Sequence, residues 1–172
     1  SPLATVIGVF LAMIPPIYSY CLIALRVMIP SIKIHIGTIM IKKIFDNERQ
    51  YLNFFFDKVD IQKMEELLEI LKECKGALVL SGVGKSGLIA KKIAATMTST
   101  NTRALFLSPV NALHGDIGIV SPEDIFIFLS KTGESDELLT LIPSLRNKKV
   151  KLIAVVSNVN SRLAKACDIV VH

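Results

Sequence analysis

The sequence predicts an α/β fold in which helices connect the strands of an open parallel sheet. Five short apolar runs follow Gly76, and such runs are typical of strands buried on both faces of a parallel sheet. Helical patterns lie between several of them, and this alternation indicates right-handed crossover connections. The runs are residues 77–80, 104–107, 125–129, 152–156 and 168–171.

An apolar extension, residues 1–39, precedes this pattern and contains no Asp or Glu. The uncharged stretch from Leu3 to Leu25 is long enough to span a bilayer, for which about 20 residues suffice. However, Pro15 and Pro16 would kink such a helix. No basic segment precedes the stretch, as one would in a signal peptide. We favour an extension that is extraneous to the fold, with a membrane anchor as the alternative.

Residues 40–75 are expected to form two helices ahead of the sheet domain, residues 76–172. Asp46 could cap a short helix that runs through Lys58, and Asp60 could cap a second one over residues 61–73. Four apolar side chains share one face of the second helix, as packing against a core requires. They are Ile61, Met64, Leu68 and Leu71.

Three further helices are expected between the strands. The first runs from Ser86 to Met97, with Lys91 and Lys92 outside its apolar stripe, and the last covers residues 161–167. Between them, residues 134–145 form a helical pattern that Pro143 must kink or restart, because proline lacks an N–H. Its apolar side chains are Leu138, Leu141, Ile142 and Leu145.

Serine follows four of the five apolar runs directly. In open parallel sheets, ligands bind outside the carboxyl ends of the strands. Each serine could instead cap the next helix, but the four together favour an anion site. The four residues are Ser81, Ser108, Ser130 and Ser157.

The stretch from Val79 to Ala94, VLSGVGKSGLIAKKIA, nearly fits two nucleotide motifs. A P-loop would need glycine at Val79. The dinucleotide fingerprint is matched by its three glycines, but no acid follows in residues 99–106 to bind a ribose. What remains is a glycine turn that opens a helix, whose free N–H groups favour an anion. Lys85 strengthens this interpretation, because a bound anion would offset the unfavourable placement of a cation at a helix N-terminus.

Composition narrows the classes of partner. The net charge is +5, and the basic residues are scattered without an aromatic–basic stripe, so nucleic acid is not expected as a partner. The three cysteines, Cys21, Cys74 and Cys167, match neither a disulfide framework nor a zinc spacing. We therefore expect a reducing compartment, the cytoplasm, and neither a metal nor another cofactor.

Three segments, residues 81–100, 111–125 and 129–143, together resemble the sugar isomerase (SIS) domain. Within that family, the LHGD segment, residues 113–116, resembles the arabinose 5-phosphate isomerases of the KpsF/GutQ type. The resemblance implies a five-stranded Rossmann-like sheet and a homo-oligomer. It also implies the interconversion of D-arabinose 5-phosphate and D-ribulose 5-phosphate, which supplies the Kdo sugar of lipopolysaccharide.

The resemblance also implies roles for individual residues. Lys85, His114 and Glu137 fall on catalytic positions of the family, and burial would suit Glu137 to proton transfer. Glu134 is expected only to complement the dipole of the helix that begins there. The expected substrate- and phosphate-binding residues are Ser81, Gly84, Ser86, Asn101, Thr102, Ser130, Thr132, Gly133 and Ser135.

The sequence departs from the family in two respects. Ser108 stands where the family often has a histidine associated with zinc, which again argues against a metal. The family continues past the position of His172 with further catalytic segments and usually with CBS domains. We therefore expect an incomplete SIS domain whose own activity is open. The alternatives are a phosphosugar-binding regulatory module without catalysis and a membrane-tethered fold without a ligand.

Overall fold

The computed structural model describes residues 38–172. Residues 63–172 form one compact unit, and the described residues before them belong to another. The predictions made for residues 1–37, including the apolar stretch from Leu3 to Leu25, lie outside the described residues. Within residues 38–172, no helix has the length and apolar character that crossing a membrane requires.

The first described helix, α2, spans Thr38–Lys58. The prediction that Asp46 caps a shorter helix was wrong, because Asp46 lies inside α2. The residues of α2 before it include no Gly or Pro, so nothing in the sequence ends the helix there. Several large apolar side chains of α2 are exposed. They are Ile41, Phe45, Tyr51, Phe54 and Phe56.

The second helix, α3, spans Ile61–Lys72 and follows Asp60 as predicted. Its buried side chains are Leu67 and Leu71, whereas Ile61 is 61% exposed. The predicted apolar face was therefore wrong at Ile61, because burial is confined to the later turns of the helix.

The compact unit contains the predicted five-stranded, all-parallel sheet, in the order β2-β1-β3-β4-β5. Each apolar run became a strand. The short strand β2 lies at one edge and is only half-buried, because it has a neighbour on one side. The strands are β1 (Leu78–Gly82), β2 (Ala104–Phe106), β3 (Ile125–Ser130), β4 (Lys151–Val156) and β5 (Ile169–Val171).

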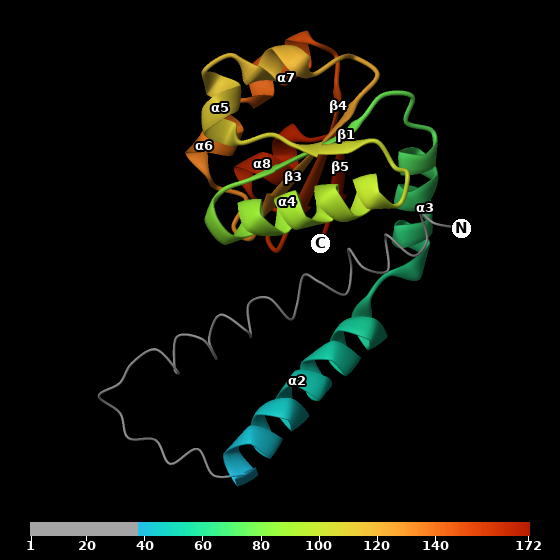
Figure 1. The fold of residues 1–172 in the computed structure, drawn as a ribbon, viewed down its shortest axis with the longest axis vertical. Coiled ribbons are helices and arrows are strands. Elements are labelled where there is room, and N and C mark those ends of the chain that lie inside the picture. Colours follow the sequence, from blue (N-terminus) through green and yellow to red (C-terminus); the bar gives the residue numbers. More distant parts are fainter. Residues whose placement is uncertain (1–37) are drawn as a thin grey trace. The chain divides into compact units, whose positions relative to one another are not determined.

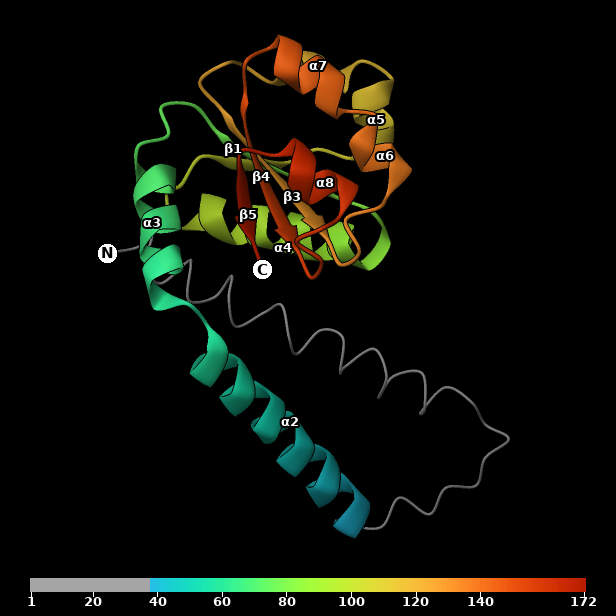
Figure 2. The ribbon, with the colours of Figure 1, turned by 180° about the vertical axis from the view of Figure 1, so that it is seen from behind.

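Helices cover both faces of this sheet (Figures 1 and 2). Helix α4 (Gly84–Ser99) packs on β1 and β2 through the predicted stripe of Ile89, Ile93 and Met97, which is buried. The opposite face carries α5 (Pro109–Leu113), α6 (Asp136–Leu139), α7 (Ile142–Asn147) and α8 (Arg162–Ala166). The core on that side joins Phe126 and Phe128 of β3 to leucines of these helices.

Two local predictions concern the helices of this second face. The pattern over residues 134–145 is divided into α6 and α7, and Pro143 lies in the first turn of α7, which confirms that it restarts the helix. Ser161 caps α8, and its Oγ accepts a hydrogen bond from the Ala164 N–H at 3.3 Å. Helix α5 and the short 3₁₀ helix η1 (Asp116–Ile119) were not predicted.

Candidate functional site

The topology of the sheet indicates that a ligand would bind at its carboxyl edge, where the parallel strands end. From β1 the chain crosses to β2 on one side, whereas β3, β4 and β5 follow one another on the other side. This reversal places a topological switch point between β1 and β3, and ligands of open α/β sheets bind there, beyond the carboxyl ends of the strands. Residues 82–87, here called the glycine loop, and residues 130–135, the serine loop, leave β1 and β3 at this edge.

The glycine loop turns directly from β1 into α4. A Cβ on Gly87 would lie 2.5 Å from the carbonyl oxygen of Gly82, so only glycine allows the helix to begin so close to the strand. No side chain caps the start of α4, and its first turn contains no acid. Lys85 is exposed in that first turn, with Ser86 half-buried beside it. The uncapped helix start and the cation together favour an anion.

The serine loop is held by hydrogen bonds from its own hydroxyl groups. Ser130 is 7% exposed, and its Oγ accepts the Gly133 N–H at 3.0 Å. The Oγ1 of Thr132 accepts the Glu134 N–H at 3.3 Å. Because both hydroxyls act as acceptors within the loop, each keeps its proton to donate to an anion. Ser135 is the N-cap residue of α6 and makes no capping hydrogen bond with its side chain.

Ser81 differs from these hydroxyls. It is fully buried, and its Oγ donates a 2.8 Å hydrogen bond to the carbonyl oxygen of Leu107, which follows β2. The single hydroxyl proton is thereby used within the fold. This bond indicates a structural role for Ser81, which ties β1 to β2, rather than the predicted contact with a ligand.

The predicted catalytic residues belong to elements that follow the carboxyl ends of β1, β2 and β3. Glu137 lies in the first turn of α6, and His114 is the C-cap residue of α5, a helix that contacts α6. Both side chains are exposed. Burial within the chain, the condition under which Glu137 would suit proton transfer, is therefore not met, because α6 turns its buried side toward the core through Leu138.

Asn101 and Thr102 lie at the amino edge of the sheet, where the parallel strands begin. They follow the end of α4 and precede β2, whose first residue pairs with the first residue of β1. A helix of 16 residues is about 24 Å long. The structure therefore does not bring these two residues together with Lys85 within one copy of the chain.

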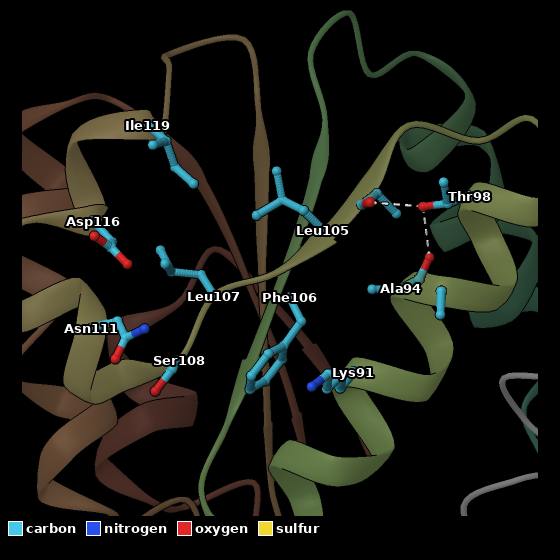
Figure 3. Close-up of a pocket in the computed structure, with 12 residues that line it drawn as sticks. Lys91, Ala94, Thr98, Leu105, Phe106, Leu107, Ser108, Asn111, Asp116 and Ile119 are labelled. Atoms are coloured by element: carbon cyan, nitrogen blue, oxygen red, sulfur yellow. Dashed lines mark hydrogen bonds between the residues drawn. The ribbon is translucent and has the colours of Figure 1, made fainter.

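A separate depression of about 760 Å³ lies beside the edge strand β2 (Figure 3). Apolar side chains such as Leu105 and Ile119 line it, with Lys91 and Asp116 among its polar residues. Ser108, one of the four serines of the sequence pattern, also faces this depression. None of the predicted catalytic or binding residues lines it.

Glu134 has a partner that the sequence did not indicate. It precedes α6, and its carboxylate binds Arg162, 28 residues further along, with 2.6 Å between Nε and Oε2. Hydrogen bonds from Arg162 lower the pKa of Glu134. The expectation that Glu134 complements the dipole of its own helix was therefore wrong, because its carboxylate accepts the backbone N–H of Arg162 at the start of α8. No local pattern could have paired residues so far apart.

The fold and the two loops define a doubly wound α/β domain with an anion-favouring edge at its switch point. The family model for the SIS domain matches residues 70–172. The chain therefore belongs to the SIS domain family, as its sequence motifs predicted.

Two of the similar curated proteins are arabinose 5-phosphate isomerases. Arabinose 5-phosphate isomerase KpsF of Escherichia coli O6:H1 is 44% identical over 115 residues, which are 67% of this chain and 35% of that protein. Arabinose 5-phosphate isomerase KdsD of Yersinia pestis is 45% identical over 120 residues, 70% of this chain and 34% of that protein. The chain thus spans about a third of the length of these curated relatives.

A solved structure from E. coli CFT073, in complex with arabinose 5-phosphate, is also similar. It has a TM-score of 0.72 and 36% sequence identity, and the match covers 79% of this chain and 73% of that one. Similarity at this level extends the family assignment from sequence motifs to the arrangement of strands and helices.

Proposed function

We propose that this chain is the sugar-phosphate-binding domain of an aldose–ketose isomerase that interconverts D-arabinose 5-phosphate and D-ribulose 5-phosphate. The observation that carries the proposal is the pair of loops at the switch point. One offers an uncapped helix start with Lys85, and the other offers hydroxyl groups with protons to donate. The relatives named as arabinose 5-phosphate isomerases, and the similar structure in complex with arabinose 5-phosphate, support the choice of sugar.

The phosphate would be bound mainly by the serine loop. The hydroxyl groups of Ser130, Thr132 and Ser135 donate to phosphate oxygens, and Gly133 keeps the loop in its tight conformation with a φ of 70°. The amides at the start of α4, from Gly84 to Ser86, add the positive end of a helix dipole. Contacts by Asn101 and Thr102 remain a prediction that would need a second copy of the chain.

The chemistry requires a base and an electrostatic stabiliser. Isomerisation moves a proton between C1 and C2 of the sugar through an enediol, so one group must take and return that proton. We assign this role to Glu137. Lys85 stabilises the charge of the phosphate or the charge that develops on the enediolate oxygen, and His114 donates a hydrogen bond to that oxygen or assists ring opening.

The domain boundaries remain part of this proposal. Residues 76–172 form the sheet domain, residues 40–75 the helices before it, and residues 1–39 an extension that does not contribute to the site. The cytoplasm is the proposed compartment in which the domain meets its sugar phosphate.

Titration with D-arabinose 5-phosphate tests the binding half of this proposal. We expect Lys85→Ala to weaken binding about ten- to a hundredfold, since hydrogen bonds to charged groups contribute about 1.5–3 kcal/mol. Lys91→Ala is the matched control, because Lys91 is exposed on the same helix but lines the depression beside β2. Weakening by Lys91→Ala instead of Lys85→Ala would place the ligand at β2 and contradict the proposal.

Proton exchange tests the catalytic half. In D₂O, a competent site replaces the C2 proton of D-arabinose 5-phosphate with deuterium, and the C2 proton signal disappears from the NMR spectrum. Glu137→Gln should stop this exchange without weakening binding. Binding without exchange in the wild-type chain would favour the regulatory module over the enzyme.

A further inference from the structure

The segment that leads from β4 into α8 forms backbone hydrogen bonds with the serine loop. The Ser157 N–H donates to the carbonyl oxygen of Lys131, and the Leu163 N–H donates to that of Gly133, both at 3.0 Å. Gly133 also packs against Ser161, because an added Cβ would lie only 2.1 Å from the Ser161 Oγ. The loop is thus attached to this segment at several points along its length.

Arg162 makes the most extensive of these attachments. Besides the 2.6 Å contact of its Nε with Glu134 Oε2, its backbone N–H donates to Glu134 Oε1 at 3.0 Å. Its Nη2 donates to the Glu134 carbonyl oxygen at 3.1 Å and to Asp136 Oδ1 at 3.0 Å. One side chain therefore binds both the carboxylate and the backbone of a residue inside the serine loop, as well as the next acid along the chain.

These contacts matter because of the charge that the loop carries. Glu134, Asp136 and Glu137 place three acids within and just after a loop that is proposed to bind a phosphate dianion. Carboxylates within a Debye length of a phosphate repel it. Arg162 forms ion pairs with Glu134 and Asp136. Among residues 41–172, no arginine forms an ion pair with the third acid, Glu137, which is the proposed base.

We propose that Arg162 is a positioning residue of the sugar-phosphate site, which holds the Glu134 carboxylate against α8 and cancels its charge beside the bound phosphate. This inference rests on the proposed function, since it concerns the same site. The lowered pKa of Glu134 agrees with it, because the carboxylate stays ionised and paired. Arg162 is a positioning residue and not a catalytic one, because its contacts are with the loop.

A purely structural role would give a different pattern of mutant effects. If Arg162 served only to brace the loop, any substitution that breaks its pair with Glu134 would weaken ligand binding. If it cancels charge, removal of Arg162 weakens binding, but removal of the Glu134 charge does not. The two roles are therefore separated by the variants Arg162→Ala, Glu134→Gln and the double variant.

The test is calorimetric titration of the full 172-residue chain with D-arabinose 5-phosphate and, separately, with inorganic phosphate. We expect Arg162→Ala to weaken binding of both by about three- to tenfold at low salt, with a smaller effect at high salt. Glu134→Gln should bind at least as tightly as wild type. The double variant should regain most of the loss, because the only acid left without its arginine is then Asp136, which follows the loop and is 83% exposed.

Arg146→Ala is the matched control. Arg146 is also exposed and forms an ion pair of the same 2.6 Å length, but with Asp168, which precedes β5 at the other end of α8. Its removal should leave binding unchanged. This variant shows how much of any loss comes from removing an exposed arginine rather than from the serine loop.

The outcomes separate this inference from the function on which it rests. If wild type binds neither ligand, the proposed function falls and takes this inference with it. If wild type binds and Arg162→Ala binds equally well, only the inference is overturned. If Arg162→Ala binds weakly and the double variant is no better, charge cancellation is wrong. Weak binding by Glu134→Gln alone would refute it as well.

Discussion

Gly133→Ala should be among the most damaging small substitutions in the serine loop. Gly133 has a φ of 70°, and an alanine in this left-handed conformation costs about 1–2 kcal/mol. The added Cβ would also lie 2.1 Å from Oγ and 2.5 Å from Cβ of Ser161, which is only 1% exposed. Ser161 must therefore move, and α8 loses its N-cap hydrogen bond at a cost of about 0.5–2 kcal/mol.

Together these contributions predict that Gly133→Ala lowers the free energy of unfolding by about 1.5–4 kcal/mol. Gly84→Ala is the matched control. Its φ is 57°, but no atom lies within 4 Å of the added Cβ, so only the conformational cost of about 1–2 kcal/mol applies.

Urea unfolding followed by circular dichroism measures both variants. The difference between them isolates the contact of Gly133 with Ser161. If Gly133→Ala is no less stable than Gly84→Ala, the serine loop does not pack against α8 as described, and the attachment of the loop is wrong.

Three further predictions use other parts of the compact unit. In urea unfolding, Leu138→Ala should destabilise the fold by about 2–5 kcal/mol, because Leu138 is fully buried. The control is Leu88→Ala, at a position 71% exposed, which should change the free energy of unfolding by less than about 0.5 kcal/mol. Burial raises the pKa of the Cys167 thiol to about 12, so its rate of iodoacetamide alkylation should still rise with pH between about 8 and 10, and a plateau near pH 9 would contradict this. Because Arg162 lowers the pKa of Glu134 from 4.5, their pair stabilises the fold fully above that pH and loses its effect as the pH falls through the lower folded-state value. The difference in unfolding free energy between wild type and Arg162→Ala should therefore shrink below about pH 4, and a difference that grows there would refute the pairing.

The sheet could be predicted because its signal is local. The central strands β1 and β3 are buried at every residue, so four or five consecutive apolar residues suffice to reveal them. Pro143 likewise acts on its own helix, and the division into α6 and α7 followed from its missing N–H. In contrast, α5 and η1 have five and four residues, too few turns for a helical period to appear.

Within the candidate site, only the contacts that one loop makes with itself can be read from the sequence. The hydroxyl groups of Ser130 and Thr132 bind amides two or three residues away, so the sequence already contained that arrangement. The bond from Ser81 to the Leu107 carbonyl depends on how β1 pairs with β2, and no local pattern reveals it. The pairing of Glu134 with Arg162 likewise depends on the course of the chain through β4 into α8, which brings two residues distant in the sequence together.

We propose above all that a sugar phosphate binds between the glycine loop and the serine loop. The most direct test is an NMR titration of backbone amides with D-arabinose 5-phosphate, compared with unphosphorylated D-arabinose. We expect the phosphorylated sugar to shift the amides of residues 82–87 and 130–135 and D-arabinose not to shift them. Shifts confined to residues 104–108 and 116–119, beside the depression at β2, would contradict it.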